Sequence, residues 1–156
     1  MNQIKQEKGE KEKNFNNEIH IREMLVDDIS AVHYLWRAVG FEFSASDEPE
    51  EIERMIKRNP NTCLILEAKD VMVGSVLGGF DGRRGWVHHL SIHPEYQHKG
   101  FGRKLMEELT DRFKKMGIKK IKLEILDHNP DLIGFYESIG WKNRTELATM
   151  SMTLGK

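Results

Sequence analysis

The sequence predicts a mixed α/β fold in which a mostly antiparallel central sheet contains one parallel pair of strands. Apolar and alternating runs at 62–67, 71–80 and 86–93 are joined by short turns, which is typical of an antiparallel meander. An amphipathic stretch at 101–116 predicts a helix, and residues 121–125 predict a further strand. A strand, a helix and a strand in this order form a right-handed crossover, so 86–93 and 121–125 should lie parallel.

The segments before the meander are predicted to be one strand and two helices. Residues 19–23 alternate apolar and polar side chains, as a half-buried strand does. Apolar residues at three- and four-residue spacing predict a helix over 29–39 that stops at Gly40. A shorter helix over 52–56 should end before Asn59-Pro60, because the residue before a proline is biased away from helical geometry.

The last segments are predicted to be one helix and two strands. Asn129 and Pro130 indicate the start of a short helix, because asparagine caps helix N-termini and proline fits the first helical position. This helix should end at Gly140. Residues 141–144 and 148–154 are expected to close the fold as an antiparallel pair.

Length and composition indicate a single domain, residues 18–156, that follows a disordered charged tail, residues 1–17. The formal net charge of -1 gives no general attraction to nucleic acid or to an anionic membrane. No apolar run approaches the roughly 18–20 residues that cross a bilayer. The single cysteine, Cys63, excludes an intramolecular disulfide and lies in an apolar strand, where we expect inert core filler. These features together predict a cytoplasmic protein.

Four histidines, at positions 88, 89, 93 and 98, raise the question of a metal site. His88 and His89 should point to opposite faces of their strand. His89 and His93 share a face but would lie about 13 Å apart at the usual strand rise, too far to bind one ion directly. We therefore expect no metal.

The junction between the strand ending near His93 and the helix at 101–116 carries the spacing Gln97-x-x-Gly100-x-Gly102. The first N–H groups of a helix have no partner inside it, and glycine lets a ligand approach the backbone closely. With the helix dipole and the nearby cations Lys99 and Arg103, this predicts a diphosphate cradle. A nucleoside-triphosphate loop would need Gly-Lys-Ser/Thr here, and a dinucleotide fingerprint would sit earlier in the chain. A plain helix start with helpful glycines is the alternative.

Two segments resemble the GNAT N-acetyltransferase superfamily. Residues 87–102 (VHHLSIHPEYQHKGFG) are similar to its strand-to-helix signature, and residues 129–141 (NPDLIGFYESIGW) to its later helix. The order of elements matches from about residue 18 to residue 154, and residues 73–82 resemble a poorly characterised branch of the family. The resemblance implies a three-layer sandwich with helices on both faces, in which the parallel strands splay apart, and it implies acetyl-CoA as the cofactor.

The resemblance also implies a role for individual residues. The backbone of Leu90, Ser91 and Ile92 would hold the pantetheine arm like an added strand. Asn129 would contact the cofactor near the splay, and Tyr136 would lie near the thioester sulfur. The backbone N–H groups that would bind the pyrophosphate belong to Gln97, His98, Lys99, Gly100, Phe101, Gly102 and Arg103.

Acetyl transfer to an amine needs a proton acceptor and a donor to the leaving thiolate. Tyr136 is the expected general acid. Glu124 matches a glutamate that some peptide-acetylating members place beside the acceptor, and it is the expected base, although it could simply face solvent or pair with a lysine. His89 and a water molecule are the other candidates. Trp86 stands where histone-acetylating members carry a glutamate, which argues against their arrangement.

The predicted function is therefore transfer of acetyl from acetyl-CoA to a primary amine of a small molecule, peptide or protein, by direct attack. The acceptor pocket should include the loop 41–49, with Phe41 and Phe43, the turn 81–85 and residues 141–149. One alternative is a non-catalytic sensor or scaffold that binds acyl-CoA on the same fold, and another is a nucleotide-phosphate binder. The expected partner is the amine acceptor, without nucleic acid or membrane, and the resemblance makes a homodimer an option.

Overall fold

The computed structural model describes residues 18–126 and 129–155. The tail predicted for residues 1–17 lies outside the described residues. The chain divides into two compact units, one up to Lys122 and one from Leu123 onward.

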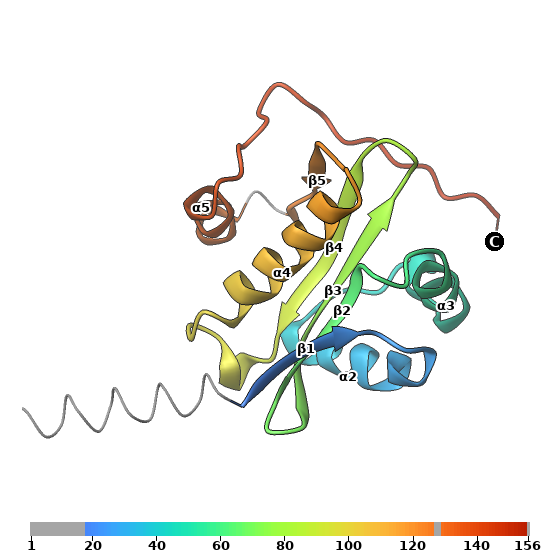
Figure 1. The fold of residues 1–156 in the computed structure, drawn as a ribbon. Coiled ribbons are helices and arrows are strands. Elements are labelled where there is room, and N and C mark those ends of the chain that lie inside the picture. The colour runs from blue at the N-terminus through green and yellow to red at the C-terminus, as the bar shows by residue number, and fades with distance from the viewer. Residues whose placement is uncertain (1–17, 127–128, 156) are drawn as a thin grey trace, which may run out of the picture. The chain divides into compact units, whose positions relative to one another are not determined.

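The central sheet has five strands in the order β1-β2-β3-β4-β5 (Figure 1). The first three neighbouring pairs are antiparallel, and β4 and β5 form the predicted parallel pair. This confirms the mixed, mostly antiparallel sheet. The strands are β1 (Ile19–Glu23), β2 (Cys63–Ala68), β3 (Val71–Phe80), β4 (Gly85–Ile92) and β5 (Ile121–Leu123).

Helices cover the two faces of this sheet (Figure 1). The helices α2 (Ile29–Val39) and α3 (Pro49–Arg58) pack on one face, and α4 (Phe101–Lys115) packs on the other. Successive side chains of a strand point to opposite faces. Cys63 and Ile65 of β2 accordingly join the core under α2 and α3, whereas the α4 residue Leu109 approaches Gly78 of β3 from the other side.

The core under α2 and α3 is apolar and tightly closed. Cys63 is fully buried in it, and burial raises the pKa of its thiol to about 12, which agrees with the expected inert filler. Trp36 is also fully buried, and its indole N–H donates to the hydroxyl of Ser75 on β3 at 3.3 Å. The members of this core are Met24, Ile29, Val32, Trp36, Ile52, Ile56, Cys63, Ile65 and Leu77.

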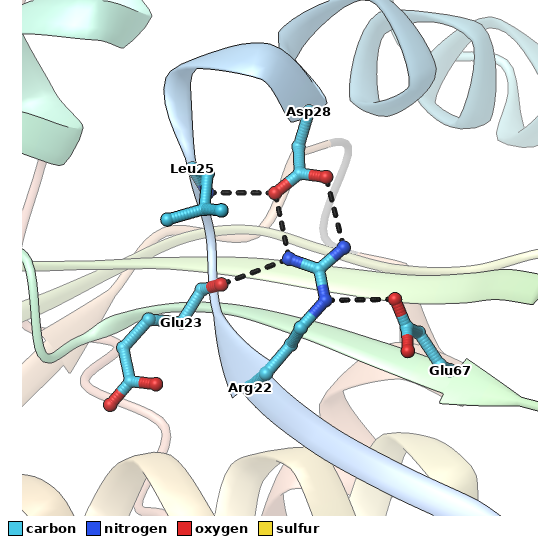
Figure 2. Close-up of polar contacts among 5 residues, drawn as sticks. All are labelled: Arg22, Glu23, Leu25, Asp28 and Glu67. Atoms are coloured by element: carbon cyan, nitrogen blue, oxygen red, sulfur yellow. Dashed lines mark hydrogen bonds and ion pairs between the residues drawn. The ribbon is translucent and has the colours of Figure 1, made fainter. Parts of the chain in front are cut away.

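Arg22 joins β1 to the start of α2 and to β2 (Figure 2). Its guanidinium donates to both carboxylate oxygens of Asp28, at 2.8 and 2.9 Å, and to Glu67 at 2.8 Å. Asp28 also accepts the backbone N–H of Leu25 at 2.7 Å, which closes a 3₁₀ turn ahead of α2. Because the pair is bidentate and largely shielded, it fixes the position at which α2 leaves the strand.

The second unit contains helix α5 (Pro130–Ser138). As predicted, the side chain of Asn129 caps it by accepting the backbone N–H groups of Asp131 and Leu132, at 3.0 and 3.3 Å. Within this unit the ring of Tyr136 packs edge-on against Trp141, with ring centroids 5.7 Å apart.

Two expectations about the C-terminal part were wrong. The strand expected over 121–125 ends at Leu123, so Glu124 lies outside the strand and is exposed. The strand pair expected at 141–144 and 148–154 does not form; both segments are irregular. Their local sequence pattern favours strands, but a pair of strands is stable only when other elements cover its apolar face. Met150 and Met152 instead remain 93% and 83% exposed.

No helix in the part of the chain that the structure describes is long and apolar enough to cross a membrane.

Candidate active site

The segment between β4 and α4 presents backbone donors at an open helix start. Gly100 has a φ of 81° and precedes the first residue of α4, Phe101. The N–H of Lys104 is the first to bond back, to the carbonyl of Gly100 at 3.2 Å. The N–H groups of the turn before it therefore have no acceptor inside the helix, and no side chain caps Gly100.

The space beside Gly100 is open among the described residues. A Cβ built on Gly100 would meet no atom within 4 Å, so the backbone is open to a ligand. His98 also has a positive φ, 61°, and alternating left- and right-handed residues turn successive N–H groups toward a common concavity that suits an anion. The segment thus fits a diphosphate group. Gln97, His98, Lys99, Gly100 and Arg103 are exposed, whereas Gly102 is half-buried and Phe101 is buried.

The C-terminal half of β4 extends beyond its parallel neighbour. The N–H of Gly85, at the start of β4, donates to the carbonyl of Lys120 at 3.0 Å, and β5 then continues for only three residues. Leu90, Ser91 and Ile92 follow at the far end of β4, where Ser91 and Ile92 pair with β3. The amide of Gln97 donates to the carbonyl of Ile92 at 2.9 Å and fixes the exit of the strand.

A β-bulge interrupts β4 at His89. The register with β3 shifts between the pairs Leu77–His88 and Ser75–Ser91. His89 has a φ of 51°, a left-handed conformation that costs free energy for any residue other than glycine. The hydroxyl of Ser91 donates to the carbonyl of His89 at 3.0 Å and so stabilises the bulge. The strict alternation expected along this strand therefore fails at His89, and the bulge redirects its side chain.

The side chain of His89 meets the carboxylate of Asp47. The distance from Nε2 to Oδ1 is 2.7 Å, and the two side chains are 28% and 6% exposed. The second oxygen of Asp47 accepts the backbone N–H of Ser44 at 2.8 Å and the hydroxyl of Ser44 at 3.0 Å. Burial raises the pKa of Asp47, but the hydrogen bonds from the Ser44 backbone and His89 outweigh it, and the net pKa lies below the ordinary value. Asp47 is therefore ionised at neutral pH.

Aromatic rings enclose this pair. The imidazole of His89 lies between Trp36 and Phe41, with ring centroids 4.6 and 4.8 Å away. Phe43 continues the wall and packs on His33 of α2 at 5.0 Å. His33 is 8% exposed, and its Nε2 is buried without a hydrogen-bond partner among the described residues.

The structure brings together only part of the predicted acceptor pocket. The loop 41–49 does reach β4 through Phe41 and Asp47. The turn 81–85 lies at the opposite end of β4, where Asp81 accepts the backbone N–H groups of Arg83 and Arg84. These bonds and one from the Trp86 indole lower the pKa of the Asp81 carboxyl to about 2. Asp81 thus holds its own turn in shape.

The other predicted site residues lie in the second unit. Tyr136 is 7% exposed, and burial raises the pKa of its hydroxyl to about 12. Glu124 is exposed. Asn129 is the N-cap of α5.

The sequence analysis did not single out Asp47, His33 or Trp36. The Ser44-x-x-Asp47 spacing is a capping signature and could have located a structured turn in the loop. Nothing in the local sequence shows that this carboxylate meets a histidine 42 residues later in the chain.

Comparisons with known proteins identify relatives of this chain. The profile of the acetyltransferase (GNAT) family matches residues 29–141. An acetyltransferase of Pectobacterium atrosepticum is 32% identical over 138 residues, which cover 88% of this chain and 94% of that protein. One of Yersinia pseudotuberculosis is 31% identical over 126 residues, covering 81% and 89%.

A solved structure has the same fold. The PaiA N-acetyltransferase from Thermoplasma acidophilum, in complex with coenzyme A, superposes with a TM-score of 0.69 at 21% sequence identity. The superposition covers 80% of this chain and 89% of that one.

Proposed function

The chain belongs to the GNAT family of acetyltransferases, and we propose that it transfers the acetyl group of acetyl-CoA to a primary amine by direct attack. The observation that carries the proposal is the helix start at Gly100, which no side chain caps and which has open space beside it, at the end of a strand that is longer than its parallel neighbour. This arrangement suits a ligand with a diphosphate at one end and an amide-containing arm at the other.

Acetyl-CoA has this composition, and members of the family use it. In the proposal, the backbone N–H groups from Gln97 to Arg103 bind its pyrophosphate. The segment of β4 at residues 90–92 binds its pantetheine arm, and Asn129 contacts it near the splay. Lys99 and Arg103 add positive charge beside the diphosphate. When bound, acetyl-CoA supplies the thioester carbonyl that the amine attacks.

Tyr136 is proposed to give a proton to the departing thiolate. A general acid must hold its proton at the working pH and release it only in the transition state. Burial raises the pKa of the Tyr136 hydroxyl to about 12, so it stays protonated at neutral pH. For the proton of the amine, Glu124 is the acceptor favoured by the resemblance; it is exposed and lies just beyond the end of β5.

Thermal melting with acetyl-CoA, CoA, ATP and NAD tests the cofactor. A ligand at about 100 times its Kd should stabilise the fold by about 2.7 kcal/mol, which raises the Tm clearly. We expect a shift with acetyl-CoA and CoA only. A shift with ATP and none with CoA would contradict the proposal and favour a nucleotide binder.

Thiol release then separates an enzyme from an acyl-CoA sensor or scaffold. Benzylamine, spermidine and a peptide with an N-terminal alanine represent three classes of primary amine. Amine-dependent release of CoA, with the acetylated amine identified by mass, is the expected result. Tight binding of acetyl-CoA with no turnover of any amine or protein would favour the sensor.

A further inference from the structure

We propose that His89 accepts the proton of the attacking amine, that Asp47 positions it, and that Phe41, Phe43 and His33 seat the acceptor beside it. The inference rests on the proposed acetyl transfer and assigns the base and the acceptor subsite. All five residues lie in the first unit, which ends at Lys122.

The first argument is the geometry of the pair. Nε2 of His89 and Oδ1 of Asp47 are 2.7 Å apart, and Asp47 is held in turn by Ser44. A base that is itself oriented by a fixed carboxylate is the arrangement that activates nucleophiles in many transferases and hydrolases. The carboxylate is shielded, whereas the imidazole is 28% exposed and so remains partly accessible.

The second argument is the strained backbone. His89 occupies a left-handed conformation inside a strand, and Ser91 stabilises the bulge that imposes it. Such strain persists only where the surroundings enforce it, and it gathers at functional sites. The bulge also places His89 directly before residues 90–92, the strand edge assigned to the pantetheine arm.

The third argument is the unpaired nitrogen of His33. A buried polar atom without a partner costs free energy, and native proteins satisfy most such atoms. The ring of His33 packs against the rings of Trp36 and Phe43, with centroids 5.4 and 5.0 Å away. We infer that a polar group of the bound acceptor pairs with Nε2 of His33.

The electrostatic surroundings decide which ring nitrogen reacts. Asp47 contacts the imidazole of His89 directly. His33 and Arg37 of α2 contact the ring of Phe43, with the guanidinium of Arg37 5.0 Å from its centroid. An ionised Asp47 can only accept, so Nε2 of His89 carries the hydrogen and Nδ1 holds the lone pair. No hydrogen bond within residues 18–126 and 129–155 engages Nδ1.

The step balances as follows. The lone pair of the neutral amine forms the new bond to the thioester carbonyl carbon, and the proton of the amine passes to Nδ1. The carbon–sulfur bond breaks with its electron pair on sulfur, which takes up a proton. The products are the acetylated amine and free CoA. His89, now an imidazolium beside Asp47, returns its proton to solvent through its exposed edge.

Nitrogen NMR of labelled histidine side chains tests the pair without any acceptor. The signals that disappear in His89→Gln identify those of His89. In the unaltered protein, we expect neutral His89 to carry its proton on Nε2. In Asp47→Asn the side-chain amide can donate to Nε2, so the proton should move to Nδ1. A neutral His89 with its proton on Nδ1 in the unaltered protein would overturn the proposal.

Turnover with the amine that reacts best, among benzylamine, spermidine and the alanine peptide, tests the role. His89→Gln should lower kcat by about 10²–10⁴-fold, the usual contribution of a general base. The matched control is His88→Gln, the exposed neighbour in the same strand, which should keep kcat. Asp47→Asn should lower kcat and leave KM for acetyl-CoA unchanged, whereas His33→Phe should raise KM for the amine.

Chemical rescue separates a lost base from a damaged fold. Added imidazoles should restore turnover of His89→Gly, and the more basic ones should restore more. CoA binding, measured by the rise in Tm, should be the same in all variants. A variant that lost CoA binding would therefore be distinguished from one that lost only the base. If Glu124→Gln removes activity while His89→Gln keeps it, Glu124 is the base and the proposal is wrong.

Discussion

Thr62, directly before β2, and Gly78, near the end of β3, are joined by two hydrogen bonds. The N–H of Gly78 donates to the carbonyl of Thr62 at 2.9 Å, and the hydroxyl of Thr62 donates to the carbonyl of Gly78 at 2.7 Å. Leu109 of α4 packs onto the same spot. Only a residue without a Cβ fits here, so this glycine sets how closely α4 approaches the sheet.

Gly78→Ala should therefore destabilise the protein. The new Cβ would lie 2.6 Å from the carbonyl oxygen of Thr62 and 2.7 Å from a methyl carbon of Leu109, and the backbone atom cannot give way cheaply. Overpacking of this kind costs about 1–3 kcal/mol. Urea unfolding measures the loss. The control is Gly79→Ala, whose Cβ would meet only the flexible end of Met55, at 3.0 Å. Equal losses in the two variants would refute this account.

Gly100→Ala should weaken CoA binding. Gly100 has a φ of 81°, where a side chain is strained by about 1–2 kcal/mol, although the space around it is open. Relief of that strain would turn the N–H groups of the helix start away from the diphosphate. We expect at least about a tenfold rise in Kd, or about 1.4 kcal/mol, by calorimetry.

Gly117→Ala is the matched control for that variant. Gly117 follows the other end of the same helix with a φ of 78° and equally open space. The two variants should lose similar stability, and only Gly100→Ala should lose affinity. A similar loss of affinity in both would mean that general destabilisation, and not the loop, is responsible.

Much of the fold could be predicted because its signals are local. The first strand, 19–23, and the helix 29–39 were predicted with the bounds that the structure gives. The crossover rule predicted the parallel pair, because it needs only the order strand, helix, strand along the chain. The strands at 141–144 and 148–154 failed, because forming a strand depends on a distant partner and on what covers its face.

A candidate site can be read from the sequence only where one stretch of chain builds it. The cradle at 97–102 is a single strand-to-helix junction, so its glycine spacing can be read directly. The Asp47–His89 pair joins a loop to a β-bulge, and neither the bulge nor the contact leaves a local pattern. The alternation of side chains predicted a regular strand at His89. That rule assumes one residue for each position of the strand, and a bulge inserts an extra residue.

Asp28→Asn should cost stability at neutral pH and much less in acid. The hydrogen bonds from Arg22 lower the pKa of Asp28, although burial opposes them. A carboxyl whose pKa is lowered by folding stabilises the protein above its unfolded pKa, about 3.9. That contribution is lost as the pH falls through the folded pKa. We expect a loss of about 1–3 kcal/mol near pH 7, the range for a charged hydrogen bond.

Urea unfolding of both proteins across the acid range measures the difference. It should shrink as the pH falls below about 4. Asp27→Asn, on the same turn but exposed, is the control and should stay within about 0.5 kcal/mol of the unaltered protein. A loss from Asp28→Asn that is the same at every pH would point to packing and not to the ion pair.

Tyr136→Phe should remove most of the turnover and leave CoA binding intact. As the proposed general acid, Tyr136 contributes about 10²–10⁴-fold to kcat, and phenylalanine keeps the ring that packs on Trp141. Because burial raises its pKa to about 12, kcat of the unaltered protein should show no loss from this hydroxyl between neutral pH and about pH 10. Tyr34→Phe, 71% exposed on α2, is the matched control and should keep full activity. If Tyr136→Phe turns over normally, the thiolate takes its proton from solvent, and Tyr136 serves only to pack the second unit.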